Sequence, residues 1–133
     1  MRRKKPSTVK VVQYSSSQPQ VIESTYALLF FQQVLDTISF SYVDNDDHKT
    51  YMTVNEDEVG CMRIGESNTF CRFSKNKKTL LIKDTDVSTH VLVVDNKNVE
   101  TNVNYIKVEY DLTMDDAWLD TITMSWEIED NEE

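Results

Sequence analysis

Residues 105–112 read YIKVEYDL and residues 121–128 read TITMSWEI, and both stretches alternate apolar and polar side chains. The apolar positions are Ile106, Val108, Tyr110 and Leu112 in the first stretch and Ile122, Met124, Trp126 and Ile128 in the second. Successive side chains of a β-strand point to opposite faces, so each stretch has one apolar and one polar face. The two stretches therefore predict antiparallel strands that are buried on one side, joined by a loop at residues 113–118.

The same alternation continues toward the N-terminus. Residues 37–43 predict another strand, and residues 59–65 and 69–73 predict a hairpin around the polar turn at 66–68. The continuous apolar run at 91–94 predicts a strand that is covered on both faces. About eight to ten such strands, separated by short polar loops, predict an all-β, antiparallel meandering barrel, because barrel closure protects the edges of the sheet.

Residues 23–35 fit either of two structures by their local pattern. Their apolar side chains recur at helical spacing, and Ser24 or Thr25 would cap a helix start. The alternative is a strand at 21–32, a turn at 33–36 and the strand that begins at Thr37. Local periodicity slightly favours the helix.

Charge and composition narrow the expected partners. The 133 residues predict a single domain, with flexible ends at 1–6 and 129–133. The formal net charge of −9 repels phosphate backbones and anionic lipids, so neither nucleic-acid binding nor membrane association is expected. The longest apolar run is far too short to span a bilayer and no secretory signal is visible, which predicts a cytoplasmic protein with reduced cysteines.

Short motifs from Val59 onward resemble the DUF1934 or YwiB-like family of uncharacterised bacterial proteins. The matching residues are Arg63-Ile64-Gly65-Glu66, Phe73, Thr85, the run 91–94, Val108-Glu109-Tyr110-Asp111-Leu112 and, upstream, Ile38-Ser39-Phe40-Ser41-Tyr42. The resemblance covers residues 21–128. It implies a calycin-like, lipocalin-type β-barrel without an established activity, and it implies strand rather than helix at 21–32. The chain departs from the family pattern at Leu81, Ile82, Asp86 and Ser88, so the loop at 84–88 is expected to differ in shape from that of the family.

Arg63 is the residue with the most specific candidate role. If Val59 and Cys61 face the barrel interior, the alternation places Arg63 on the same face. A buried guanidinium needs a carboxylate or several acceptors, and it could hold an anionic ligand group through two hydrogen bonds. The alternative is that Met62 and Ile64 face inward and Arg63 lies in water or in a structural ion pair.

The aromatic residues Tyr42, Tyr110 and Trp126 lie on apolar strand faces and could line a ligand cavity. Together with Arg63, and with Phe73 from the family resemblance, they form the candidate ligand-binding set. The alternative is ordinary core packing, because small barrels are usually filled by their own side chains.

No motif in the sequence indicates a catalytic or metal-binding site. The acidic loop around His48, with Asp44, Asp46 and Asp47, lacks the pattern of a calcium loop and is interpreted as solvated. Cys61 and Cys71 are expected to lie opposite each other as packed thiols, without the spacing of a zinc site. We therefore expect no catalytic residues, no metal, no cofactor and no enzymatic activity.

The leading hypothesis is a cytoplasmic barrel that binds a small apolar or anionic molecule inside or at its mouth. The alternative is a non-enzymatic protein–protein interaction domain with a packed interior, which an exposed apolar patch would support. The candidate partners are thus a small-molecule ligand or another protein, for a chain that is a monomer or a homodimer.

Overall fold

The computed structural model describes residues 6–130, which form eleven antiparallel β-strands and no helix. The all-β meander is confirmed, with eleven strands rather than eight to ten. The strands are β1 (Pro6–Ser15), β2 (Ile22–Ala27), β3 (Phe30–Val34), β4 (Thr37–Val43), β5 (Lys49–Val54), β6 (Glu58–Ile64), β7 (Asn68–Ser74), β8 (Lys78–Asp84), β9 (Thr89–Thr101), β10 (Tyr105–Met114) and β11 (Ala117–Asp130). Residues 6–130 therefore contain no helix that could cross a membrane.

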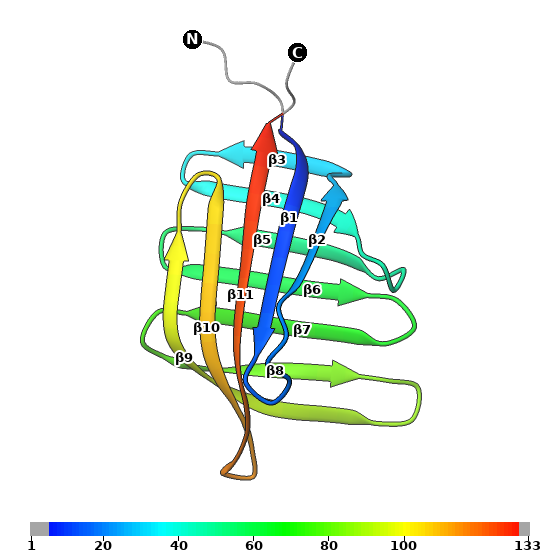
Figure 1. The fold of residues 1–133 in the computed structure, drawn as a ribbon, viewed down its shortest axis with the longest axis vertical. Coiled ribbons are helices and arrows are strands. Elements are labelled where there is room, and N and C mark those ends of the chain that lie inside the picture. The colour runs from blue at the N-terminus through cyan, green and yellow to red at the C-terminus, as the bar shows by residue number, and fades with distance from the viewer. Residues whose placement is uncertain (1–5, 131–133) are drawn as a thin grey trace.

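The strands form one sheet that is folded into two crossing layers (Figure 1). The sheet order is β2-β1-β11-β10-β9-β8-β7-β6-β5-β4-β3. Among the described strands, β1 and β11 are the only paired strands that are not consecutive in the sequence. β9 passes between the layers: its first half pairs with β8 and its second half with β10. β1, β2, β10 and β11 cross in front of β3 to β8 in the view of Figure 1.

The two ends of the sheet, β2 and β3, do not pair with each other. The residues that join them bond in different directions: the amide of Leu28 donates to Ser7 on β1, and the amide of Leu29 donates to Ser41 on β4, each at 2.9 Å. The sheet is therefore a half-closed barrel, and the edge of β2 faces the other layer without a strand ladder.

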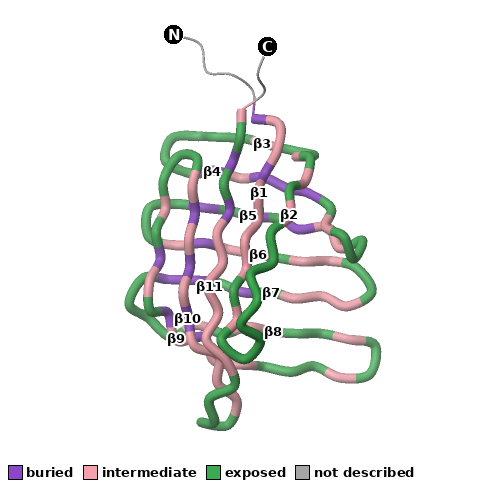
Figure 2. The backbone as a smooth tube through the Cα atoms, in the orientation of Figure 1, coloured by how far each residue is buried: buried purple, intermediate pink, exposed green. Residues whose placement is uncertain are grey.

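The core lies between the two layers, where the inward faces of their strands meet (Figure 2). The apolar faces that were predicted at 106–112 and 122–128 point into it, and Ile106, Val108 and Trp126 are completely buried. Leu112 and Ile122 pack against the same core while remaining partly exposed. The alternation of the sequence thus translates directly into the inner and outer faces of the strands.

The ambiguous segment is strand, and the helical alternative is wrong. It forms two strands, β2 and β3, rather than one continuous strand at 21–32, because the chain leaves one layer at Leu28 and enters the other at Leu29. The turn between β3 and β4 contains Leu35, which has a φ of 54°. Strand pairing with β1 and β4 outweighs the local helical spacing.

Three further expectations are corrected by the structure. The run 91–94 is not covered on both faces, because Val91 is 49% exposed on the outer side of β9. Residues 113–118 are mostly strand, with a tight turn at Asp115 and Asp116. Of the ends expected to be flexible, Pro6 lies in β1 and residues 129–130 lie in β11, while residues 1–5 and 131–133 lie outside the described residues.

Candidate functional site

A cavity of about 500 Å³ lies between the two layers. Its walls come from β1, β2, β10 and β11 on one side and from β4 to β8 with the β4–β5 loop on the other. The lining residues are Val11, Gln13, Ile22, Ser24, Tyr26, Tyr42, Asp44, Asn45, Asp46, Thr50, Cys61, Arg63, Thr69, Cys71, Phe73, Leu81, Tyr110, Met124 and Trp126. The barrel is therefore not fully packed by its own side chains.

The five residues proposed from the sequence all line this cavity: Tyr42, Arg63, Phe73, Tyr110 and Trp126. They come from five different strands of both layers, and each occupies an inward position of its strand. The four aromatic side chains are buried, and Arg63 is the partly exposed member of the set. Of the two faces that the sequence left open on β6, the inward one is that of Cys61 and Arg63, because both line the cavity while Met62 is exposed outside.

Tyr42 connects the two layers at the centre of the cavity wall. Its ring stacks on Tyr26 of β2, with centroids 5.1 Å apart and planes 11° from parallel, and on Phe40 at 6.4 Å. Its hydroxyl accepts a hydrogen bond of 3.0 Å from the indole Nε1 of Trp126. Burial raises the pKa of Tyr42 well above its usual value, so this hydroxyl stays protonated.

One buried hydroxyl group, that of Thr50, lines the cavity without a hydrogen-bond partner among residues 6–130. It lies beside the hydroxyl of Tyr42 but completes no hydrogen bond. Leaving such a group unsatisfied costs about 1–3 kcal/mol, so the Thr50 hydroxyl is ready to bond a molecule in the cavity. Tyr110 lines the cavity as well and packs on Phe73, with ring centroids 4.9 Å apart.

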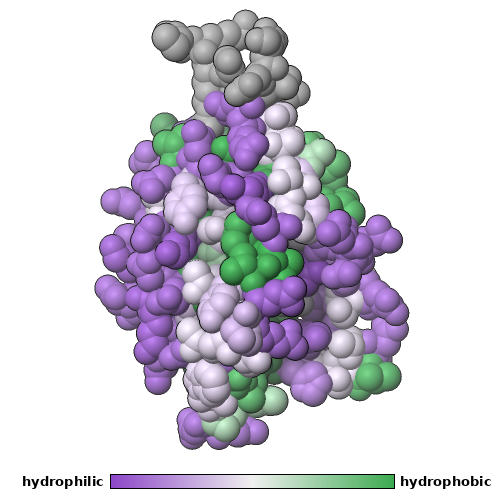
Figure 3. All heavy atoms as spheres, in the orientation of Figure 1, coloured by the Kyte–Doolittle hydropathy of each residue, from purple (hydrophilic) through white to green (hydrophobic). Residues whose placement is uncertain are grey.

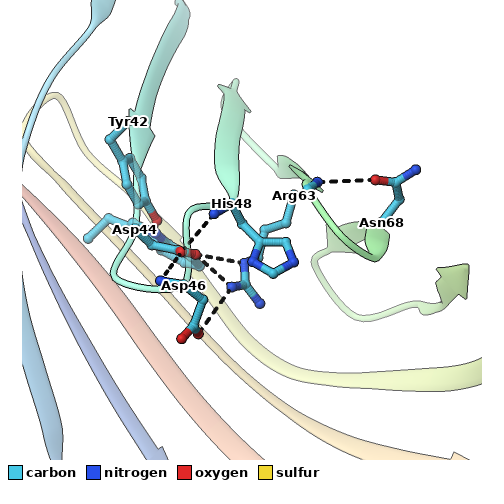
Figure 4. A network of polar contacts seen from close by, with 8 residues as sticks. Tyr42, Asp44, Asp46, His48, Arg63 and Asn68 are labelled. Carbon is cyan, nitrogen blue, oxygen red and sulfur yellow. Dashed lines mark hydrogen bonds and ion pairs between the residues drawn. The ribbon is translucent and has the colours of Figure 1, made fainter. Parts of the chain in front are cut away.

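Arg63 lies at the rim of the cavity and is held by the β4–β5 loop (Figure 4). Its Nε and Nη2 atoms donate to one carboxylate oxygen of Asp44, at 3.0 and 2.6 Å. Nη2 also lies 3.9 Å from a carboxylate oxygen of Asp46. The guanidinium is therefore compensated inside the protein, and the rim, with two carboxylates to one guanidinium, is weakly negative.

Asp44 is the functional residue that the sequence interpretation missed. It was expected in a solvated loop, but its side chain is only 11% exposed. One carboxylate oxygen binds Arg63, and the other accepts the amides of Asp46 at 2.9 Å and His48 at 3.2 Å. Burial alone would raise the pKa of Asp44, but these hydrogen bonds outweigh it and lower the pKa. The detectable signal was the Asx-turn pattern, an Asp two residues before a polar turn residue.

His48 packs against Gly65, the residue that follows β6. A Cβ atom at Gly65 would lie 2.7 Å from the His48 ring, so glycine at that position makes room for the imidazole. Within residues 6–130, no three His, Cys, Asp or Glu side chains are grouped so that they could hold a metal ion.

Cys61 and Cys71 lie directly opposite each other on β6 and β7, as the hairpin pattern predicted. Both are free thiols that line the cavity. Burial raises the pKa of Cys61 to about 12 and also raises that of Cys71. Because the thiolate is the reactive form, these groups act as packed, unreactive side chains at neutral pH.

Comparison with known proteins places this architecture in one family. A family model described as "Domain of unknown function (DUF1934)" matches residues 8–125. The crystal structure of the ywiB protein from Bacillus subtilis superposes with a TM-score of 0.71 at 21% sequence identity, covering 97% of this chain and 95% of that chain. The C-terminal domain of HtaA from Corynebacterium glutamicum has a TM-score of 0.40 at 7% identity, over 95% of this chain and 98% of that chain, which is a distant likeness. No curated protein matches the sequence. The likeness to ywiB shows the fold and leaves the function open.

Proposed function

We propose that this chain, which belongs to the DUF1934 family, binds a small uncharged molecule with an apolar body in the cavity between its layers. The observation that carries the proposal is the cavity itself. Its volume of about 500 Å³ falls within the roughly 300–1,000 Å³ of typical ligand pockets. Aromatic and aliphatic side chains and two cysteines make up the larger part of its wall, and polar groups converge on it, which is the usual composition of a binding site.

The charges at the rim favour an uncharged ligand over an anionic one. An anionic group at Arg63 would either compete for its Nε and Nη2 atoms with Asp44, which also holds two backbone amides of its own loop, or bind Nη1 beside the carboxylates of Asp44 and Asp46. The first would leave a partly buried carboxylate without its partner and the second would bring like charges together, so both are costly. The formal net charge of −9 opposes the approach of anions as well.

The free hydroxyl group of Thr50 indicates which polar feature the ligand carries. Thr50 lines the cavity, and its hydroxyl has no hydrogen-bond partner in the described chain. A ligand with a hydrogen-bonding atom on an otherwise apolar frame satisfies it. The ligand is therefore a compact molecule that carries a hydroxyl, carbonyl or similar group.

Entry takes place beside the edge of β2. This strand ends the sheet, and Ile22 both lines the cavity and is more than half exposed. Figure 3 shows hydrophobic side chains gathered over β1 and β2 in the middle of the front face. The proposed role is binding without catalysis, in a lipocalin-type barrel that works in the cytoplasm, where Cys61 and Cys71 remain reduced.

Binding of the neutral fluorophore 1-aminoanthracene tests the proposal. In the Trp118→Phe variant, Trp126 is the remaining tryptophan, and it lies in the cavity wall. We expect saturable energy transfer from Trp126 to the bound probe. Native mass spectrometry of the purified protein then reports any molecule that co-purifies.

Two matched variants separate cavity binding from surface binding. Val11→Phe, made in the Trp118→Phe background, fills the cavity that Val11 lines, whereas Val12→Phe in the same background adds the same ring at a position outside the cavity lining. We expect loss of binding in the first and wild-type binding in the second, with circular dichroism confirming that both fold. The absence of saturable binding, or equal binding by both variants, would overturn the proposal.

A further inference from the structure

The outer side of the β5–β9 layer carries a continuous apolar row. The row consists of five directly paired positions on five neighbouring strands: Tyr51, Met62, Phe70, Ile82 and Val91. Four of them are between 36% and 49% exposed, and Ile82 is partly buried. This face lies on the side of the sheet opposite the cavity, so what binds there is independent of the proposed ligand.

Next to the row, a hollow on β6 matches a projecting side chain on β8. Gly60 lies two residues from Met62 on the same face, and a Cβ atom placed there would touch only the Thr53 carbonyl oxygen, at 3.8 Å. A surface groove passes over this glycine. Leu80 lies two residues from Ile82 on the same face and is half exposed. Beside the row, the surface is therefore hollow at Gly60 on β6 and projects at Leu80 on β8.

Charges of opposite sign flank the row in the same arrangement. Glu58 lies on β6, two residues beyond Gly60, and Lys78 lies on β8, two residues beyond Leu80. Between them, Arg72 is neutralised by Glu58 of its own chain at 3.0 Å. This face thus combines an apolar centre with one acidic and one basic side, in a protein whose formal net charge is −9.

We propose that this face binds a second copy of the chain, through a two-fold axis that runs along β7 between the two stacked sheets. Such an axis exchanges β5 with β9 and β6 with β8 and leaves β7 opposite itself. An isologous interface requires one surface to be complementary to itself under this exchange. The face meets that requirement in shape, in apolar content and in charge.

The exchange produces specific contacts. Phe70 meets Phe70 of the second copy, Met62 meets Ile82, and Tyr51 meets Val91, so the apolar row covers itself. Leu80 of each copy enters the hollow above Gly60 of the other. Glu58 of each copy faces Lys78 of the other, and the two Arg72 side chains meet on the axis, each already paired with Glu58 of its own chain. A partner of a different kind would need only one of these features, whereas a second copy uses all three.

Sedimentation equilibrium of the full chain tests the proposal. We expect a reversible dimer and a weakening of about 100-fold or more for Phe70→Glu, because this change places two carboxylates against each other on the axis. Leu119→Glu is the matched control, since Leu119 is a similarly exposed leucine on β11, outside the row. It should leave the dimer unchanged.

A charge exchange distinguishes the proposed axis from any other dimer. Glu58→Lys and Lys78→Glu should each weaken association, and the double variant should restore it, with circular dichroism confirming the fold of every variant. A wild-type chain that stays monomeric up to about 1 mM would overturn the proposal. So would a dimer that is insensitive to Phe70→Glu, or a double variant that associates no better than the single ones.

Discussion

The indole Nε1 of Trp126 donates a hydrogen bond of 3.0 Å to the hydroxyl of Tyr42, a residue 84 positions away in the chain. Trp126 lies on β11 in one layer, and Tyr42 lies on β4 in the other. Both side chains are buried, and both line the cavity. This bond therefore holds the two layers in register at the cavity wall.

Removing the acceptor of this bond should destabilise the protein. Tyr42→Phe leaves the buried indole N–H without a partner, and we expect the free energy of unfolding in urea to fall by about 1–3 kcal/mol. Tyr14→Phe is the control, because Tyr14 is 40% exposed on β1 and should change stability by no more than about 0.5 kcal/mol. Equal effects of the two variants would show that the Trp126 bond contributes nothing specific.

The charge of Asp44 should decide which ligands the rim accepts. Asp44→Asn keeps an oxygen for the amides of Asp46 and His48 but leaves Arg63 without its buried counter-charge. We expect affinity for the anionic probe 1-anilinonaphthalene-8-sulfonate to rise by about tenfold, as one charged hydrogen bond becomes available. Asp47→Asn removes a charge from the same loop without touching Arg63, so a rise of the same size in that variant would contradict the assignment.

The buried thiols should limit stability at alkaline pH. Burial raises the pKa of Cys61 from 9.0 to about 12 and also raises that of Cys71, so the unfolded chain releases these protons first. Their contribution is complete below pH 9 and is lost as the pH rises toward 12. Urea unfolding between pH 8 and 11 should therefore show a decline, and the double variant Cys61→Ser, Cys71→Ser should decline less steeply, by at most about 1.4 kcal/mol per pH unit for each thiol. Tyr42 and Tyr110, whose pKa values burial also raises, account for the decline that remains. Parallel curves for the two proteins would refute the role of the thiols.

The turn between β3 and β4 carries a correctable strain. Leu35 has a φ of 54° and is 91% exposed, so its side chain gains no burial to offset the left-handed backbone. Leu35→Asn should raise the free energy of unfolding by up to about 1 kcal/mol, because asparagine tolerates this conformation better. Asn76→Ala makes the reverse change at a φ of 60° and should lower stability. Thermal unfolding of both variants checks the prediction, and a shift of the same sign in both would count against it.

Strand identity was predictable wherever alternation was strong, as at 105–112, 121–128 and 59–65. The same rule placed Arg63 on one face with Cys61 but left open whether that face points inward, and the structure shows that both residues line the cavity. It also placed Tyr42, Tyr110 and Trp126 on apolar strand faces, which line the cavity as well. The break at Leu28 and Leu29 was not predictable from local pattern. Each amide there bonds to a different strand, and those strands become neighbours only when the sheet folds over.

The Asp44–Arg63 pair shows the same limit at the scale of single residues. Each was singled out from the sequence, Arg63 as an inward cation and Asp44 as part of an acidic loop. Their contact spans nineteen positions and depends on how the β4–β5 loop turns back over β6, held by Asp44 itself. The sequence pattern does not predict that the loop turns back or the direction in which it turns.

The sequence alone determined which residues share a face, because the two-residue period of a strand is a local property of the chain. It therefore established the strands of the β-meander and the strand faces that carry Tyr42, Arg63, Tyr110 and Trp126. Only the tertiary structure decided which faces are covered. On β5–β9, the strands alternate between an inner apolar face and an outer face that carries the apolar row. The second layer stacks on the inner face only. The inner face therefore lines the cavity, and the apolar row stays at the surface.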